Sequence, residues 1–332
     1  MIKVAVIGVG HLGKNHAKFL SKIPGCTLVG VVDTNQKAAD EIAQLYPHTK
    51  SFGVGVYQTK AYTDYKKVLR NVDAVSIATP TVAHYQIARK ALSQGIHTFI
   101  EKPITTTVLE ANKLISLAEK YKAVLQVGHI ERFNPTFVAA KEYLQNPKFI
   151  ECHRLSSFSF RSIDIDIVLD LMIHDIDLIL SIVKSPGKKV DAVGVKIISD
   201  KNDLANARLV FANGCVANLT ASRASDKAMR KMRIFTGTTY ASIDFAEKTA
   251  SVYQSKGDLS TLATNPPPGF NPKEFMLDKF INVRNLVITP YDQLEQELTS
   301  FVEAISGNKT PQVTGADGRD ALAICHKILG KI

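Results

Sequence analysis

The sequence predicts a two-domain protein: an α/β domain with a parallel, doubly wound sheet, followed by an α+β domain with a large open mixed or antiparallel sheet. Its 332 residues are too many for one typical core. Up to residue 127, short β-branched runs alternate with helical apolar periodicity, as in a parallel sheet covered by helices on both faces. From residue 128 the segments alternate apolar with polar residues, which is typical of a sheet covered on one face. We therefore place the domains at residues 1–127 and 128–332.

Strands of the first domain are expected where the apolar runs are nearly continuous, because a strand buried on both faces has no polar side. They lie at residues 3–7, 27–32, 74–77, 97–100 and 124–127. A further strand, interrupted by glycine, is expected around residues 51–55. Apolar residues at helical spacing predict helices at residues 12–23, 36–45, 62–70, 83–93 and 108–121.

Strands of the second domain are expected where polar and apolar residues alternate. They lie at residues 150–160, 190–198, 208–211, 216–221, 233–236 and 241–245. One helix, at residues 166–183, interrupts the strands, and the proline-rich run at 265–269 is expected to form a loop. Two helices, at residues 293–306 and 316–329, close the chain, and we expect them to pack back on the first domain.

Composition and charge exclude several classes of protein. No run reaches the roughly 20 apolar residues of a bilayer span, and the N-terminus has no signal-peptide pattern, so we expect a cytoplasmic protein without a membrane partner. The four cysteines lie far apart, which predicts reduced thiols and no metal site. The net charge of +10 accompanies no nucleic-acid-binding motif, so it indicates an anionic small substrate or a solvated surface.

A glycine motif stands directly after the first expected strand. Gly8, Gly10 and Gly13 form G-x-G-x-x-G at the start of a helix, where backbone N–H groups and the helix dipole bind a pyrophosphate. Asp33 follows about 20 residues later, at the end of the next strand, where a carboxylate accepts hydrogen bonds from the adenosine ribose. Its charge would repel a 2′-phosphate, so NAD is favoured over NADP, although Lys37 leaves NADP open. The alternative is a structural glycine turn followed by a helix-capping aspartate.

Two further segments carry groups suited to catalysis. Lys102 follows Glu101 at the carboxyl end of an expected strand, where open α/β sheets bind their ligands. Asp170 and His174 are one helical turn apart, so they are expected to share a face of the helix at residues 166–183. Alcohol oxidation needs a base for the hydroxyl proton, and histidine titrates near neutral pH. The alternative reading is a solvated lysine and an ordinary i,i+4 pair.

The motifs, in this order, resemble the glucose-fructose oxidoreductase, inositol dehydrogenase and rhizopine-catabolism (GFO/IDH/MocA) family. The resemblance rests on Gly8–Gly13, Ala78–Pro80 with His84, Glu101–Pro103, Asp170–Asp177, Leu294–Leu298 and Pro311–Gly315. It implies that Lys102 polarises the reacting oxygen, that His174 is the acid/base and that Asp170 orients the substrate and the imidazole. It also implies a Rossmann domain and an open sheet used for oligomer contacts, and hence a homodimer or homotetramer. The chain departs from the family pattern at residues 161–166.

The expected site residues fall into cofactor contacts and substrate contacts, and no metal ligand is expected. Cofactor contacts are expected at Gly8, Gly10, His11, Leu12, Gly13, Asp33, Thr79, Pro80, His84, Glu101 and Lys102. Substrate contacts are expected at Lys102, Glu131, Arg132, Asn134, Arg161, Asp170 and His174. His16, beside the glycine motif, is interpreted as positional rather than catalytic.

The function predicted is hydride transfer between NAD and a secondary alcohol or ketone of a sugar-like substrate. The run His129–Pro135 is similar to the family branch that includes bacterial UDP-sugar 3-dehydrogenases, which implies UDP-N-acetylglucosamine oxidised at C3. Arg132, Arg154, Arg161 and the basic cluster at residues 223–233 are candidates for holding its diphosphate. A dehydrogenase of free polyols or sugars and a non-catalytic NAD-binding sensor are the alternatives.

Overall fold

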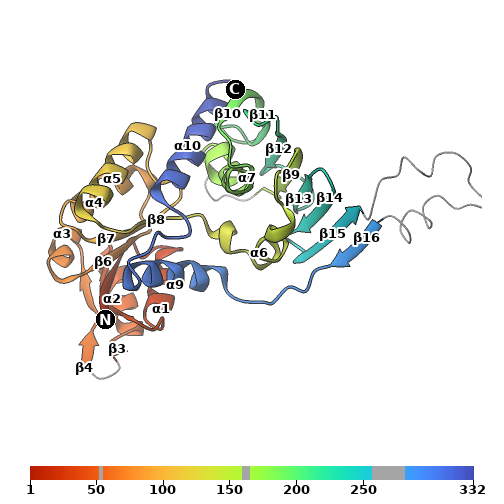
Figure 1. The fold of residues 1–332 in the computed structure, drawn as a ribbon. Helices are drawn as coiled ribbons and strands as arrows, with labels where there is room; N and C mark the ends of the chain where they lie inside the picture. The colour runs from red at the N-terminus through yellow and green to blue at the C-terminus, as the bar shows by residue number, and fades with distance from the viewer. Residues whose placement is uncertain (52–54, 159–164, 256–280) are drawn as a thin grey trace, which may run out of the picture. The chain divides into compact units, whose positions relative to one another are not determined.

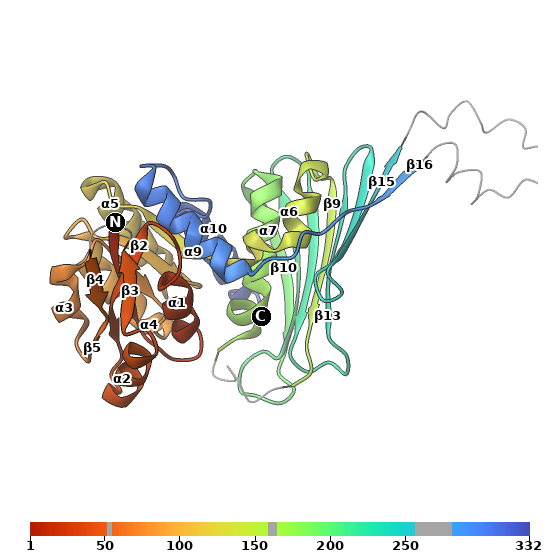
Figure 2. The same cartoon turned by 90° about the horizontal axis from the view of Figure 1, so that it is seen from below.

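The computed structural model describes residues 1–51, 55–158, 165–255 and 281–332. They form two compact units, shown in two views in Figures 1 and 2. The first unit comprises Met1–Phe133 and Tyr291–Ala323, and the second comprises Asn134–Pro290 and Ile324–Ile332. The chain returns to the first unit after Pro290, so a single boundary near residue 127 does not separate the two units.

The sheet of the first unit is parallel throughout and six-stranded, in the order β5-β2-β1-β6-β7-β8. The strands are β1 (Ile2–Ile7), β2 (Cys26–Val32), β5 (Lys60–Tyr62), β6 (Ala74–Ile77), β7 (His97–Glu101) and β8 (Leu125–Gly128). Strand order reverses between β1 and β6, which places a topological switch point at their carboxyl ends. The predicted Rossmann architecture is confirmed.

Helices connect these strands, and the chain returns to cover them. They are α1 (Gly13–Leu20), α2 (Gln36–Leu45), α3 (Tyr65–Val68), α4 (Thr81–Leu92) and α5 (Val108–Tyr121). Thr107 and Glu110 form a capping box that starts α5, which satisfies backbone donors at its first turn. The returning helix α9 (Gln293–Ser306) buries Leu298 and Phe301 in the same apolar cluster as α1, β1 and β2. α9 therefore packs on the first unit.

The third parallel strand lies later in the chain than the sequence suggests. β3 (His48–Ser51) and β4 (Gly55–Gln58) pair antiparallel in a separate two-stranded sheet. The position predicted for the third parallel strand, around residues 51–55, was therefore wrong. Residues 52–54 lie outside the described part of the chain. β5 has only three residues and pairs with β2 from Lys60 to Tyr62. Such a short edge strand carries almost no periodicity, which is why the sequence does not reveal it.

The second unit contains a mixed eight-stranded sheet, ordered β10-β11-β12-β9-β13-β14-β15-β16. The strands are β9 (Phe149–Leu155), β10 (Gly187–Val195), β11 (Leu204–Phe211), β12 (Val216–Ser222), β13 (Met229–Phe235), β14 (Thr239–Asp244), β15 (Thr249–Ser255) and β16 (Ile281–Asn285). Only the β9–β12 pair is parallel among the pairings described. Buried and exposed residues alternate along the central strands, and Figure 2 shows helices on one face of this sheet. The predicted open mixed sheet is confirmed.

The helices of the second unit include one irregular segment. α6 (Pro135–Ala140) is followed by a π-helical turn (Val168–Met172) that continues into α7 (Ile173–Val183). The last helix, α10 (Gly315–Leu329), spans the boundary between the units. Among the residues described, no helix has the length and apolar character of a bilayer span.

Candidate functional site

The glycine turn joins the end of β1 to α1 at the switch point. Gly8 has φ +86°, and a Cβ there would lie 2.8 Å from the carbonyl oxygen of Ala78. A Cβ on Gly13 would lie 1.7 Å from the carbonyl oxygen of Gly8, so no side chain fits at that position. A Cβ on Gly10, in contrast, would have no heavy atom within 4 Å. Two glycines are thus required by the fold, whereas Gly10 leaves open space above the turn.

Asp33 stands at the end of β2 and holds the glycine turn. Its Oδ2 accepts a hydrogen bond from the backbone N–H of Val9 at 3.0 Å, and its Oδ1 accepts one from that of Asn35 at 2.9 Å. The carboxylate is only partly buried and lines a cavity beside the turn. The helix after β2 is capped by Asn35, whose Oδ1 accepts the Ala38 N–H at 3.3 Å, so the helix-capping interpretation of Asp33 was wrong. The backbone contacts of Asp33 instead hold its carboxylate at the cavity wall.

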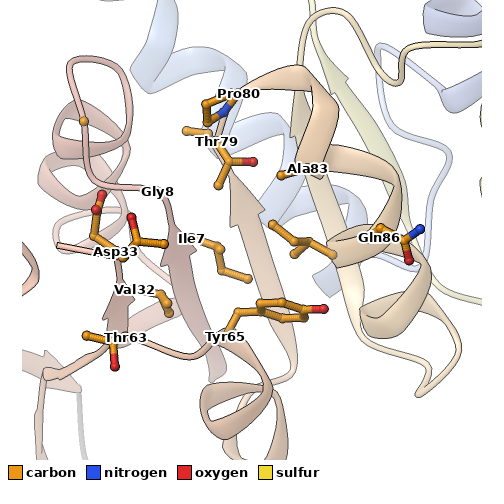
Figure 3. A pocket seen from close by; sticks show the side chains of 14 residues that line it. Ile7, Gly8, Val32, Asp33, Thr63, Tyr65, Thr79, Pro80, Ala83 and Gln86 are labelled. Carbon is orange, nitrogen blue, oxygen red and sulfur yellow. The ribbon is translucent and has the colours of Figure 1, made fainter. Parts of the chain in front are cut away.

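The cavity has a volume of about 700 Å³ and lies at the carboxyl ends of β1, β2 and β6 (Figure 3). In Figure 3, Asp33 and Gln86 lie on opposite sides of it. Its predicted members are Gly8, Gly10, Asp33, Thr79 and Pro80, and the others are Ile7, Val32, Thr34, Thr63, Tyr65, Ala78, Ala83, Gln86 and Ile87. Thr63 and Tyr65 follow β5, so correct placement of that strand would have revealed them. Ala83, Gln86 and Ile87 share one face of α4 at the spacing i, i+3, i+4.

His84 contacts the loop after β6. The His84 Nε2 lies 2.8 Å from the carbonyl oxygen of Thr79, and its Nδ1 lies 2.9 Å from that of Pro103. Burial lowers the pKa of His84, against the opposing effects of these carbonyls and of Glu101. With 1% of its surface exposed, His84 links the loop after β6 to the loop after β7 and does not line the cavity. Contact between His84 and a cofactor stays a prediction.

The lysine segment begins where β7 ends. The Glu101 carboxylate lies 2.9 Å from His16 Nε2 through Oε1, and its Oε2 accepts the backbone N–H of Lys102 at 3.3 Å. Lys102 is half-buried, and the Lys102–Pro103 peptide bond is cis. Lys102 therefore follows a carboxylate whose two oxygens are both engaged. His11, Leu12, Gly13, Glu101 and Lys102 do not line the cavity described above, so their cofactor contacts also stay predictions.

The aspartate and histidine of the second unit lie on either side of a change in helix type. Asp170 belongs to the π-helical turn and His174 to the first turn of α7, and both are half-buried. The helix predicted at this position therefore begins with a π-helical turn, and that Asp170 and His174 share a face stays a prediction. Asp166 fixes the start of this segment, because its Oδ1 accepts the N–H of Val168 at 3.0 Å and its Oδ2 accepts the amide of Asn202 at 2.7 Å.

The segment expected to contact substrate near residue 130 is largely buried. Arg132 is 8% exposed, and its Nη2 lies 3.4 Å from the Asp317 carboxylate. Asn134 caps α6 through a hydrogen bond from the Thr136 N–H at 3.1 Å. Glu131 is buried as well. Each residue thus has a position in the fold, and its contact with substrate stays a prediction; Arg161 lies outside the described residues.

Two of the other arginines proposed for a diphosphate, Arg154 and Arg223, are engaged within the second unit; Arg230 and Arg233 of the basic cluster are exposed on β13, and their contact with a diphosphate stays a prediction. Arg154 makes a bidentate contact with Asp175, with its Nε 3.0 Å from Oδ2 and its Nη2 2.7 Å from Oδ1. Arg223 lies 3.7 Å from Asp203 and donates to the carbonyl of Ile165. Both arginines are 4% exposed. Their charges are neutralised by buried carboxylates, so they do not support the interpretation that they bind a diphosphate.

Comparison with protein families gives a match to both units. Residues 2–129 match the family described as "Oxidoreductase family, NAD-binding Rossmann fold". Residues 154–257 match the family described as "GFO/IDH/MocA C-terminal domain". Together they cover both the glycine turn and most of the mixed sheet.

Individual relatives extend along nearly the whole chain. The UDP-N-acetylglucosamine 3-dehydrogenase of Acidithiobacillus ferrooxidans is 37% identical over 98% of this chain and 96% of its own. The myo-inositol 2-dehydrogenase of Thermotoga maritima is 24% identical over 97% and 94%, respectively. A solved structure of the Acidithiobacillus ferrooxidans enzyme has a TM-score of 0.86 at 34% identity, covering 100% of this chain and 97% of that one. Levoglucosan dehydrogenase in complex with NADH has a TM-score of 0.80 at 19% identity, covering 99% and 96%, which shows the shared fold.

Proposed function

The chain belongs to the GFO/IDH/MocA family of NAD-binding oxidoreductases, and we propose that it oxidises a secondary alcohol of a nucleotide-linked sugar, UDP-N-acetylglucosamine at C3. The observation that carries this substrate is the 37% identity to a UDP-N-acetylglucosamine 3-dehydrogenase over 98% of the chain. The family and the Rossmann unit make the chain an NAD-dependent dehydrogenase. The identity of the sugar and the carbon oxidised are the proposed part.

The first unit has the features that an NAD site requires. The open space above Gly10 lets backbone N–H groups approach a pyrophosphate, and Asp33 presents a carboxylate to a ribose diol. The Thr79 Oγ1 atom is buried at the cavity wall and has no hydrogen-bond partner among the described residues. A buried hydroxyl without a partner costs free energy, so a polar atom of the dinucleotide would compensate it.

The reaction needs a hydride acceptor, which NAD supplies, and a route for one proton. We assign the proton to His174, whose imidazole accepts it from the substrate hydroxyl as the carbonyl forms. The Lys102 ammonium stabilises the negative charge that develops on the same oxygen. Asp170 orients the imidazole and contacts a neighbouring substrate hydroxyl. These roles follow the motif positions in the sequence and the location of Lys102 directly after β7.

We propose that the protein forms a homo-oligomer and that its subunits contact one another through the open face of the mixed sheet. A row of partly exposed aromatic rings crosses this face: Phe235 stacks on Tyr240 at 4.7 Å, and Tyr240 on Tyr253 at 5.3 Å. Apolar surface of this kind is usually covered in an assembly. A homodimer or homotetramer is expected in a cytoplasmic protein, and Tyr240→Lys should reduce the mass measured by analytical ultracentrifugation to that of a monomer. An unchanged mass would place the subunit contact elsewhere.

The proposed substrate is tested by steady-state kinetics at 340 nm with NAD+ and four compounds: UDP-N-acetylglucosamine, UDP-glucose, myo-inositol and glucose. The expected result is the highest kcat/KM for UDP-N-acetylglucosamine. A kcat/KM for a free polyol well above those of both nucleotide sugars would overturn the assignment in favour of an inositol-type dehydrogenase. NADH binding without reduction of NAD+ in any of the four mixtures would favour an NAD-binding sensor.

A further inference from the structure

A buried histidine outside the cavity connects the glycine-turn helix to the lysine segment. His16 lies on α1 with none of its surface exposed. Its Nδ1 lies 2.8 Å from Ser76 Oγ on β6, and its Nε2 lies 2.9 Å from Glu101 Oε1 at the end of β7. The ring also packs edge-on against Phe99, with 5.5 Å between ring centroids. His16 is therefore fixed by three neighbours, two of them polar, so apolar packing alone does not explain a histidine at this position.

The polarity of this contact is set by Glu101. Burial raises the pKa of the Glu101 carboxyl, but the hydrogen bond and charge of His16, together with Lys102, outweigh it and hold the pKa below its ordinary value. Glu101 is thus ionised at neutral pH and acts only as an acceptor. Nε2 of His16 faces this carboxylate at 2.9 Å, so it is the ring nitrogen on which a hydrogen is favoured, whereas Nδ1 can either accept from or donate to Ser76.

The second oxygen of Glu101 connects this contact to Lys102. Oε2 accepts the backbone N–H of Lys102 at 3.3 Å. On the opposite side, β8 pairs with β7 through Gly128, where an added Cβ would lie 2.9 Å from the same Oε2. The carboxylate therefore fits in a space that only a glycine leaves open. With Oε1 bound by His16 and Oε2 bound by Lys102, the orientation of the carboxylate and the direction of the backbone at Lys102 depend on each other.

We propose that His16 is a positioning residue for the reaction, acting on Lys102 through the Glu101 carboxylate. The inference rests on the proposed catalytic role of Lys102. It predicts that loss of the Nε2 donor lowers turnover, because a displacement of about 1 Å in a catalytic group can cost about 100-fold in rate. It predicts little change in NAD affinity, because neither His16 nor Glu101 lines the cavity at the glycine turn.

Two substitutions separate the contacts of His16. In His16→Gln the amide nitrogen can occupy the position of Nε2 and still donate to Glu101, whereas in His16→Asn it reaches only the position of Nδ1, facing Ser76. We expect His16→Asn to lower kcat about 10- to 100-fold with the Kd for NADH within threefold of wild type. We expect His16→Gln to retain at least a third of the wild-type kcat. Equal losses in the two variants, or a loss confined to NADH affinity, would show that His16 only supports α1.

A matched control and a substrate-independent measurement complete the test. His97 lies at the first position of β7, at the opposite end from Glu101, and its Nδ1 accepts the Val124 N–H. His97→Ala should therefore leave kcat within twofold of wild type. Hydrogen–deuterium exchange at the Lys102 amide should be faster in His16→Asn than in His16→Gln, and equal rates would overturn the inference even without a known substrate. In the kinetic assay, Lys102→Met must lose turnover. If it does not, the proposed function fails, whereas an inactive Lys102→Met beside a fully active His16→Asn refutes only the positioning role.

Discussion

Replacing Gly10 and Gly13 separately by alanine distinguishes a glycine needed for ligand approach from one needed for folding. A methyl group at Gly10 meets no heavy atom within 4 Å, whereas at Gly13 it would lie 1.7 Å from the Gly8 carbonyl oxygen. Gly10 has no positive φ, so alanine should leave the unliganded protein as stable as wild type or up to about 1 kcal/mol more stable. Gly13→Ala must displace backbone by more than an ångström and should strongly destabilise the fold.

The ligand effect of Gly10→Ala follows from the same geometry. The added methyl occupies the space that a pyrophosphate would enter, and overpacking of this kind costs about 1–3 kcal/mol, or about 5- to 150-fold in Kd. Thermal unfolding without ligand and NADH titration by fluorescence measure the two effects. NADH affinity equal to wild type in Gly10→Ala would refute the placement of the pyrophosphate. A melting temperature as low as that of Gly13→Ala would refute the geometry of the turn.

Three further substitutions test other parts of the account. Asp33→Ser should weaken NAD binding and narrow the preference for NAD over NADP. Asp33→Asn should also narrow this preference if the negative charge of Asp33 is what repels NADP. An unchanged ratio of kcat/KM for NAD to kcat/KM for NADP contradicts the assignment. His174→Ala should lower kcat about 10²- to 10⁴-fold, and a loss below about tenfold would make His174 a binding residue only. Arg154→Met should lower the free energy of unfolding by about 3–5 kcal/mol because the buried Asp175 carboxylate loses its bidentate contact with the guanidinium. Combining Arg154→Met with Asp175→Leu should restore most of that free energy in urea unfolding, and equal losses in the single and double variants would contradict this.

The fold around the glycine motif could be predicted closely because its determinants are local. The spacing of Gly8, Gly10 and Gly13 and the position of Asp33 after β2 follow from neighbouring residues in the chain. Tyr65 escaped prediction because β5 has three residues and no periodicity. The apolar periodicity of residues 293–306 predicts α9 itself, but its partners in the apolar cluster depend on tertiary contacts that the sequence pattern does not record.

Two details of the second unit depend on packing rather than on sequence pattern. The spacing of Asp170 and His174 suggests a regular α-helix, but a π-helical turn intervenes. Arg154, which by charge alone could bind an anionic ligand, is buried against Asp175. Burial and pairing of a charge depend on residues distant in sequence, so net charge predicts neither.

We propose that this dehydrogenase removes the hydrogen at C3 of UDP-N-acetylglucosamine. The most direct measurement supplies NAD+ and UDP-N-acetylglucosamine deuterated at C3, followed by mass spectrometry of the reduced cofactor. We expect reduced cofactor that is heavier by one deuterium, with a lower rate than for the unlabelled sugar if hydride transfer limits turnover. Reduced cofactor without deuterium would show oxidation at another carbon, and no reduction of NAD+ at all would contradict the assignment of this substrate.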